Sequence, residues 1–161
     1  AASDVYKRQD IQNKELWIYD EHYQRGMLTD EIYQMYLDKG LKNAKIIADS
    51  AEKRLITEIK RKGISNLKPS IKGQGSIMQG VQFIQGFKIY VHPTCEHTIE
   101  ELNTYTFERD KDGNWLNKPI DANNHLMDAL RYSLEEFHFP RNNRTNVNIK
   151  KNISRAKAMG L

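Results

Sequence analysis

Short apolar runs alternate with amphipathic segments along most of this chain, and this alternation limits the possible folds more than any other feature of the sequence. The short runs are rich in aliphatic, β-branched or aromatic residues, as is typical of strands, and they lie at residues 15–19, 44–48, 66–69 and 88–91. The other segments have apolar residues three and four positions apart, as helices do, and they lie at residues 29–39, 50–63, 76–86, 94–105 and 123–137. Strands that alternate with helices predict an α/β layered fold with a largely parallel sheet.

Local capping residues predict where several of these helices begin. Thr29, Ser50 and Thr94 each stand at the start of an amphipathic segment, and each has a side-chain oxygen that can accept a hydrogen bond from the first helical turn. Residues 105–117 interrupt the alternation and predict a β-hairpin that turns at the sequence Asp-Lys-Asp-Gly, residues 110–113. In the last helix the apolar side is expected to be formed by Leu126, Ala129, Leu130 and Leu134.

Length and composition are those of one soluble globular domain. The chain has 161 residues, of which 39% are hydrophobic and 29% are charged. Its single cysteine, Cys95, excludes an internal disulfide and fits a reducing compartment. No apolar run approaches the roughly 18–20 residues that span a bilayer, so no contact with a membrane is expected.

The two ends of the chain differ from the body. The sequence DVYKRQ at residues 4–9 resembles the translation of a transposon-based sequencing adapter, so we expect residues 1–9 not to belong to the natural protein; the alternative is a natural N-terminal strand. Residues 140–161 contain six basic and no acidic side chains, which leaves 19 basic and 21 acidic residues in the rest. The net charge of +4 therefore belongs to this tail, which is either an arm that neutralises phosphates or an ordinary disordered terminus.

Three residues are candidates for catalytic chemistry. Asp49 directly follows an apolar strand and precedes a helix, which places it at the edge of the sheet where α/β proteins build their sites; a helix cap is the alternative interpretation. His125 and Asp128 stand three positions apart on the last helix and share one face, so they can bind a divalent cation or position a metal-bound water. A surface hydrogen-bonded pair is the alternative for them, and Arg131 can pair with Asp128, with Asp49 or with a phosphate.

A glycine-rich turn before the third helix is a candidate for phosphate contact. Lys72 begins the sequence Lys-Gly-Gln-Gly-Ser, whose backbone N–H groups could face a phosphate at the helix N-terminus. The sequence matches neither the Walker pattern nor the dinucleotide fingerprint. A plain turn is an equally good interpretation.

Four stretches together resemble one protein family. They are IADSAE (47–52), KPSIKGQGSI (68–77), KIYVHPTC (88–95) and NHLMDALRY (124–132). In this order and at these distances they resemble the C-terminal domain of phage terminase large subunits of the prophage-type branch, over roughly residues 15–137. The resemblance implies a ribonuclease-H-like mixed sheet flanked by helices, and residues 10–139 would be a partial nuclease domain.

The resemblance also implies roles for individual residues. Asp49 matches the acidic residue that ends the fourth strand of the family, Asp128 matches the acidic residue on the final helix, and His125 matches the histidine that assists it. Lys72 and Arg131 would contact DNA. Residues 15–19 match the third strand, so the first two strands and the first catalytic aspartate have no counterpart here, and the fragment is expected to be inactive.

The family implies a metal-dependent endonuclease that cuts concatemeric viral DNA during packaging in the cytoplasm of the infected host. Asp49, Asp128 and His125 would hold two ions, Mg²⁺ or Mn²⁺, and the fragment would bind no ATP. The partners implied are double-stranded viral DNA, an ATPase domain, the small terminase subunit and the portal. Two alternatives remain: another ribonuclease-H-like nuclease of the resolvase or transposase type, and a non-catalytic DNA-binding or assembly module.

Overall fold

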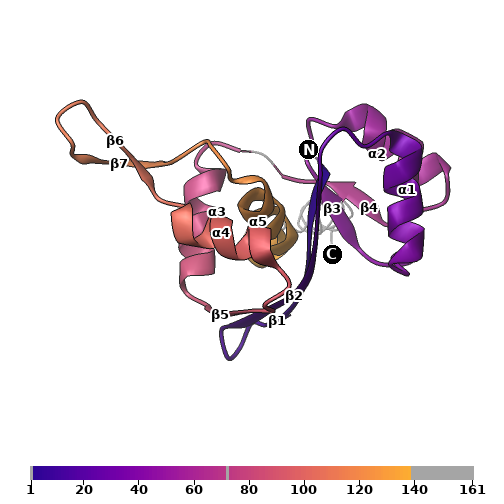
Figure 1. The fold of residues 1–161 in the computed structure, drawn as a ribbon, viewed down its shortest axis with the longest axis horizontal. Coiled ribbons are helices and arrows are strands. Elements are labelled where there is room, and N and C mark those ends of the chain that lie inside the picture. The colour runs from indigo at the N-terminus through magenta and orange to yellow at the C-terminus, as the bar shows by residue number, and fades with distance from the viewer. Residues whose placement is uncertain (1, 72, 139–161) are drawn as a thin grey trace, which may run out of the picture.

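The strands form three separate sheets in the described part of the chain, which comprises residues 2–71 and 73–138 of a computed structural model (Figure 1). The largest has the order β1-β2-β5, with β1 antiparallel and β5 parallel to β2. The parallel pair β3-β4 and the antiparallel hairpin β6-β7 are the other two. The strands are β1 (Ala2–Asp10), β2 (Glu15–Gln24), β3 (Ile46–Ala48), β4 (Leu67–Pro69), β5 (Lys88–Val91), β6 (Phe107–Arg109) and β7 (Trp115–Pro119).

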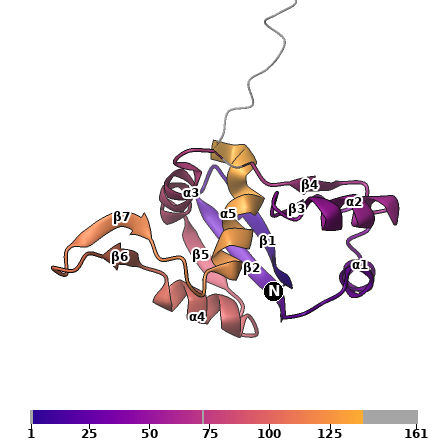
Figure 2. The ribbon, with the colours of Figure 1, turned by 90° about the horizontal axis from the view of Figure 1, so that it is seen from above.

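The last helix, α5, joins the β1-β2-β5 sheet to the β3-β4 pair. It packs against α3 and α4 and against both β1 and β3, and Figure 2 shows it between the β1-β2-β5 sheet and the β3-β4 pair. Helices α1 and α2 lie on the far side of the β3-β4 pair from α3 and α4 (Figure 1). The helices are α1 (Thr29–Asp38), α2 (Lys53–Arg61), α3 (Ser76–Gln85), α4 (Glu96–Thr104) and α5 (His125–His138).

Two apolar clusters of buried residues form the core, one on each side of the molecule. In the first, Leu16 and Ile18 point from β2 toward Leu130 and Leu134 of α5, and all four are at most 1% exposed. The second cluster contains the apolar faces of α1 and α2 and Leu67 of β4. Because α5 presents its apolar side to the first cluster, its opposite edge is free to face the space between the sheets.

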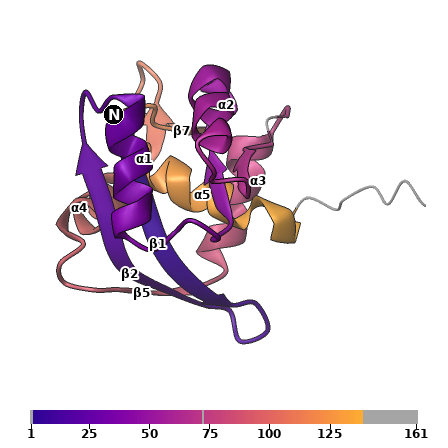
Figure 3. The same ribbon diagram turned by 90° about the vertical axis from the view of Figure 1, so that its right-hand side faces the viewer.

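The predicted element types are confirmed, with two differences in the strands. The strand expected at residues 15–19 extends to Gln24, because β1 pairs with it along its whole length (Figure 3). The sheet is mixed and not largely parallel, and among the described residues no strand pairing joins β1-β2-β5 to β3-β4. As a result, one edge of β1 and one edge of β3 have no partner strand within residues 2–71 and 73–138.

The predicted local helix caps are wrong. The residues at the N-cap positions of α1, α2 and α4 are Leu28, Glu52 and Cys95, and none of them caps its helix through a side-chain hydrogen bond. The first turn of α4 is capped from another element instead: the Glu21 carboxylate of β2 accepts hydrogen bonds from the backbone N–H groups of His97 and Thr98, at 3.0 and 2.8 Å. A cap supplied by tertiary contact leaves no local signal in the sequence.

The terminal segments are placed only in part. Residues 2–10 form the strand β1, as the alternative interpretation of this segment expected. That residues 1–9 do not belong to the natural protein stays a prediction. The basic tail at 140–161 and Lys72 lie outside the described residues. Within the described residues no helix is both long enough and apolar enough to cross a membrane.

Candidate active site

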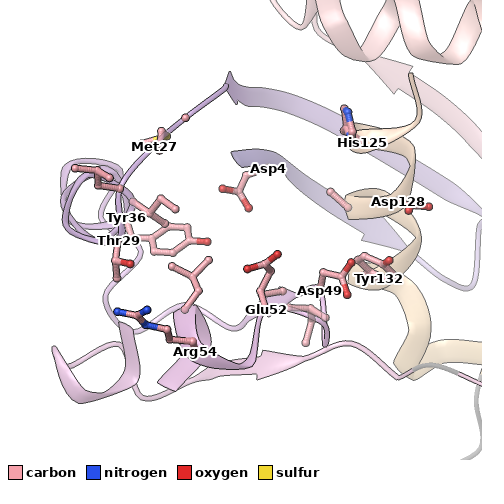
Figure 4. Close-up of a pocket in the computed structure, with 17 residues that line it drawn as sticks. Asp4, Met27, Thr29, Tyr36, Asp49, Glu52, Arg54, His125, Asp128 and Tyr132 are labelled. Atoms are coloured by element: carbon pink, nitrogen blue, oxygen red, sulfur yellow. The ribbon is translucent and has the colours of Figure 1, made fainter. Parts of the chain in front are cut away.

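A pocket of about 680 Å³ opens between the β1-β2-β5 sheet and the β3-β4 pair (Figure 4). Its walls come from β1, α1, β3, α2 and α5, and the turns that follow β2 and β3. The three residues predicted to be catalytic, Asp49, His125 and Asp128, all line it. The structure therefore brings together side chains from two distant parts of the sequence.

Asp49 stands in the turn after β3, and a set of hydrogen bonds holds this turn in place. Its Oδ1 accepts a hydrogen bond from the backbone N–H of Ala51 at 2.8 Å. Ser70, which follows β4, accepts a bond from the Ser50 N–H on its Oγ at 3.1 Å and donates its own N–H to the Ala48 carbonyl at 2.7 Å. The Ser70 side chain thus ties the two parallel strands together directly beside Asp49.

His125 and Asp128 occupy the first turn of α5, and a buried glutamate fixes where that helix begins. Glu101 of α4 is 5% exposed and accepts hydrogen bonds from the backbone N–H groups of Leu126 and Met127, at 2.8 and 3.0 Å. Burial raises the pKa of the Glu101 carboxyl, and the two N–H donors oppose this shift. A negatively charged carboxylate at the N-terminus of α5 also interacts favourably with the positive end of the helix dipole.

The surroundings of His125 are aromatic. Its ring lies 6.2 Å from that of Tyr23 at the end of β2, and Tyr23 in turn stacks on His97 at 4.5 Å. The imidazole of His125 is exposed at the rim of the pocket. It can therefore reach a water or a ligand that enters from solvent.

Arg131 lies beside Asp128 and pairs with it, while its contact with DNA stays a prediction. Its side chain is 8% exposed, and its Nη2 donates to Asp128 Oδ1 at 2.8 Å. The guanidinium also lies over the ring of Tyr132, 4.6 Å from the centroid. Of the three partners left open by the sequence, the structure selects Asp128, because the arginine is enclosed on the side of α5 that faces the protein.

Two acidic residues of the pocket were not assigned any role from the sequence. Asp4 of β1 and Glu52 at the start of α2 project into the same space as Asp49 (Figure 4). Burial raises the pKa of Asp4 to about 6, and the nearby Lys39 opposes this shift. Nothing in the sequence around Asp4 signals this position, whereas Glu52 ends the stretch IADSAE and could have been considered.

The donor atoms of the pocket suit a hard divalent cation. Four carboxylates and one imidazole line it, and its one arginine, Arg54, is paired with Glu58 at 2.7 Å. Carboxylate oxygens are the ligands that Mg²⁺ and Mn²⁺ prefer. The side chains are not drawn together, however: within the described ranges no three His, Cys, Asp or Glu residues are close enough to hold one ion. The site fits a metal by its chemistry and its position, with the ligands spread around the pocket.

The raised pKa of Asp4 predicts a stability that depends on pH. Between about pH 4 and pH 6 the folded chain keeps a proton that the unfolded chain has lost, so stability falls as pH rises through this window. We expect Asp4→Asn to raise the free energy of unfolding by about 2–3 kcal/mol at pH 8 and to change it little at pH 4. Denaturant unfolding in EDTA measures both values. Asp112→Asn, in the exposed hairpin turn, is the control, and equal effects of Asp4→Asn at both pH values would contradict the argument.

Comparison with known proteins assigns the fold to a class. The structure is similar to the crystal structure of the g2p large terminase nuclease domain from bacteriophage SPP1 with bound Mn, with a TM-score of 0.79 at 24% identity over 84% of this chain and 78% of that one. It is also similar to the large terminase of a thermophilic bacteriophage, with a TM-score of 0.59 at 20% identity over 85% of this chain and 40% of that one. The mixed sheet and the flanking helices are thus those of a ribonuclease-H-like fold.

Sequence relatives identify the family. The model of the terminase RNase-H-like domain matches residues 1–136, and the chain belongs to that family, the nuclease domain of phage terminase large subunits. The PBSX phage terminase large subunit of Bacillus subtilis is 32% identical over 130 residues, 80% of this chain. The large terminase subunit of Bacillus phage SPP1 is 29% identical over 132 residues, 74% of this chain. The chain spans about 30% of the length of these relatives.

Proposed function

We propose that this domain is a divalent-metal-dependent endonuclease that cuts concatemeric viral DNA during packaging. One observation carries the proposal: Asp49, from the end of a strand, and Asp128 with His125, from the last helix, line one pocket in a chain of the terminase nuclease family. The SPP1 nuclease domain, which has this fold, was solved with Mn, and this supports Mn²⁺ or Mg²⁺ here. The substrate is double-stranded DNA.

The roles of the residues follow from their chemistry. Asp49 and Asp128 would hold two ions between them, and such a pair supplies an activated water and stabilises the leaving oxygen of the cleaved phosphodiester. Asp49 is kept at the strand end by its own turn, so it presents a fixed carboxylate to the pocket. His125, exposed at the rim, orients the attacking water by hydrogen bonding.

The remaining assignments describe the whole protein. The ATPase domain, the small terminase subunit and the portal are the partners we propose for it, and it acts in the cytoplasm of the infected host. This fragment has no Walker sequence and is proposed to bind no ATP. The family membership favours this function over that of a resolvase or transposase. The experiment below distinguishes the nuclease from a non-catalytic DNA-binding module.

Nicking of supercoiled plasmid tests the proposal. The substrate is incubated with the domain, extended at its N-terminus by the residues of its natural gene, in Mn²⁺, in Mg²⁺ and in EDTA. Nicking in either metal and none in EDTA is expected. DNA binding without nicking in all three conditions would show that the domain is a binding module.

The basic tail gives a separate prediction about DNA affinity. The body is slightly acidic, so we expect deletion of residues 140–161 to weaken nonspecific binding and to flatten its salt dependence, by about 0.9 in the log–log slope for each phosphate that the tail neutralises. Fluorescence anisotropy of a labelled duplex at several salt concentrations measures the slope. A variant with its six basic residues changed to glutamine separates charge from chain length, and an unchanged slope would mean that the tail does not bind DNA.

A further inference from the structure

Arg131 occupies a space on α5 that exists only because α3 has a glycine opposite it. The arginine is 7% exposed, and a Cβ built on Gly80 of α3 would lie 2.4 Å from its Cγ and 2.6 Å from its Cδ. Contacts below 3.0 Å are not tolerated by real Cβ atoms, so no larger residue fits at position 80 while Arg131 keeps this conformation. A glycine inside a helix is less favourable than alanine, and here the missing side chain leaves room for the arginine stem.

The contacts of the guanidinium do not show that its burial stabilises the fold. Arg131 Nη2 bonds to Asp128 Oδ1, but within the described part of the chain the buried Nε has no hydrogen-bond acceptor. A buried donor without an acceptor is unfavourable, and buried ion pairs can often be replaced by apolar groups without loss of stability. Beside its contact with the Tyr132 ring, the ion pair with Asp128 is therefore the specific interaction that an arginine provides at this position.

The ion pair restricts Asp128 in a way that suits a metal ligand. Asp128 is 31% exposed and lies on the pocket, three residues before Arg131 on the same helix. The bond occupies Oδ1, and a carboxylate has a second oxygen that can bind a cation. A carboxylate fixed by one oxygen loses little rotational freedom when its other oxygen binds an ion.

We propose that Arg131, seated against Gly80, is a positioning residue that fixes the Asp128 carboxylate for metal binding. This inference rests on the proposed function, which assigns Asp128 as a metal ligand. Arg131 itself contacts neither DNA nor the ion. Its position in the interior explains why it is an arginine with a planar, forked donor group and not a surface lysine.

Replacement of the guanidinium tests the inference on the 161-residue chain and on the N-terminally extended domain, with Mn²⁺ alone as the probe. Arg131→Met keeps the apolar stem beside Gly80 and removes the donor group. We expect it to weaken Mn²⁺ binding, measured by water-proton relaxation, by about tenfold or more, as is usual when the partner of a metal ligand is removed. The melting temperature should change little, and Arg131→Lys should restore part of the affinity.

A double-mutant cycle shows whether Gly80 acts through Arg131. Gly80→Ala should displace the arginine and lower both Mn²⁺ affinity and the melting temperature. In an Arg131→Ala background the same change should lower neither, because the clash is gone and alanine favours the helix. Gly86→Ala at the end of α3, where the added Cβ lies 3.4 Å from its nearest neighbour, is the matched control and should leave Mn²⁺ affinity unchanged.

Asp128→Asn separates the inference from the function on which it rests. If the extended domain shows no Mn²⁺ binding, or if Asp128→Asn binds Mn²⁺ as tightly as the unaltered protein, the proposed function is wrong and the inference falls with it. If Asp128→Asn weakens binding while Arg131→Met leaves it unchanged or strengthens it, only the positioning role is overturned. Should Arg131→Met fail to fold, the Arg131→Lys and Gly80→Ala measurements decide the question in the same way.

Discussion

Asparagine at position 49 or 128 should abolish DNA cleavage by the N-terminally extended domain while leaving its folding nearly unchanged. Each substitution replaces a carboxylate that lines the pocket with a neutral amide of the same shape, so it removes the charge that holds the cation. Electrostatic stabilisation by a bound ion amounts to several kcal/mol, and every 1.36 kcal/mol is a factor of about ten in rate. We expect the rate of plasmid nicking to fall by roughly 10³-fold or more.

Matched variants separate loss of the metal site from general damage. Asp38→Asn, an exposed aspartate of α1 outside the pocket, should cut DNA at the unaltered rate. His125→Ala should be slower by roughly 10²-fold, since the imidazole is expected to orient a water and not to hold the full charge of the site. Nicking that survives in both aspartate variants, with circular dichroism unchanged, would place the catalytic centre elsewhere.

The sequence predicted the helices and strands well because their signals are local. The apolar run before Asp49 and the spacing of Leu126, Leu130 and Leu134 each depend on a few neighbouring residues, and each gave the right element. Helix starts were predicted less well. The first turns of α4 and α5 receive their caps from Glu21 and Glu101, whose contacts span large separations in sequence and cannot be found by local inspection.

The same distinction applies to the site. Asp49, His125 and Asp128 could be proposed from the sequence because each belongs to a motif with a recognisable position at a strand end or on a helix face, and all three line the pocket. Asp4 was missed because its place in the pocket depends on the pairing of β1 with β2. The burial of Arg131 could not be predicted from the sequence, because it depends on the absence of a side chain at Gly80, a residue on another helix.

The most informative comparison is between this chain as it stands and the same domain with its upstream residues added. β1 and β3 each have one edge without a partner strand among the described residues, and residues of both strands, Asp4 and Ile47 among them, line the pocket that separates the sheets. Unpaired strand edges favour aggregation and mispairing. Because no strand pairing joins β1 to β3 among the described residues, the relative position of the carboxylates on the two sides of the pocket depends on the packing of α5 against both strands.

We therefore expect the chain as it stands to be the weaker of the two in both respects. It should unfold at lower denaturant concentration than the extended domain, and it should nick plasmid at a rate near background in Mg²⁺ and in Mn²⁺. A strand placed between β1 and β3 would pair both open edges, and an aspartate on it would add a carboxylate to Asp49 and Asp128. The metal ligands, which are dispersed among the described residues, would then form a compact set. Two metal ions about 3.5–4 Å apart require such a set.

Assaying both proteins side by side decides the matter. Urea unfolding followed by circular dichroism gives the stability, and plasmid nicking in each metal gives the activity. An extended domain whose added aspartate is changed to asparagine is the control: it should recover the stability of the complete sheet without recovering the activity. If the chain as it stands unfolds cooperatively and cuts DNA as fast as the extended domain, the open edges are harmless. Residues 1–9, with Asp4 in the pocket, would then have to be counted as natural and functional sequence.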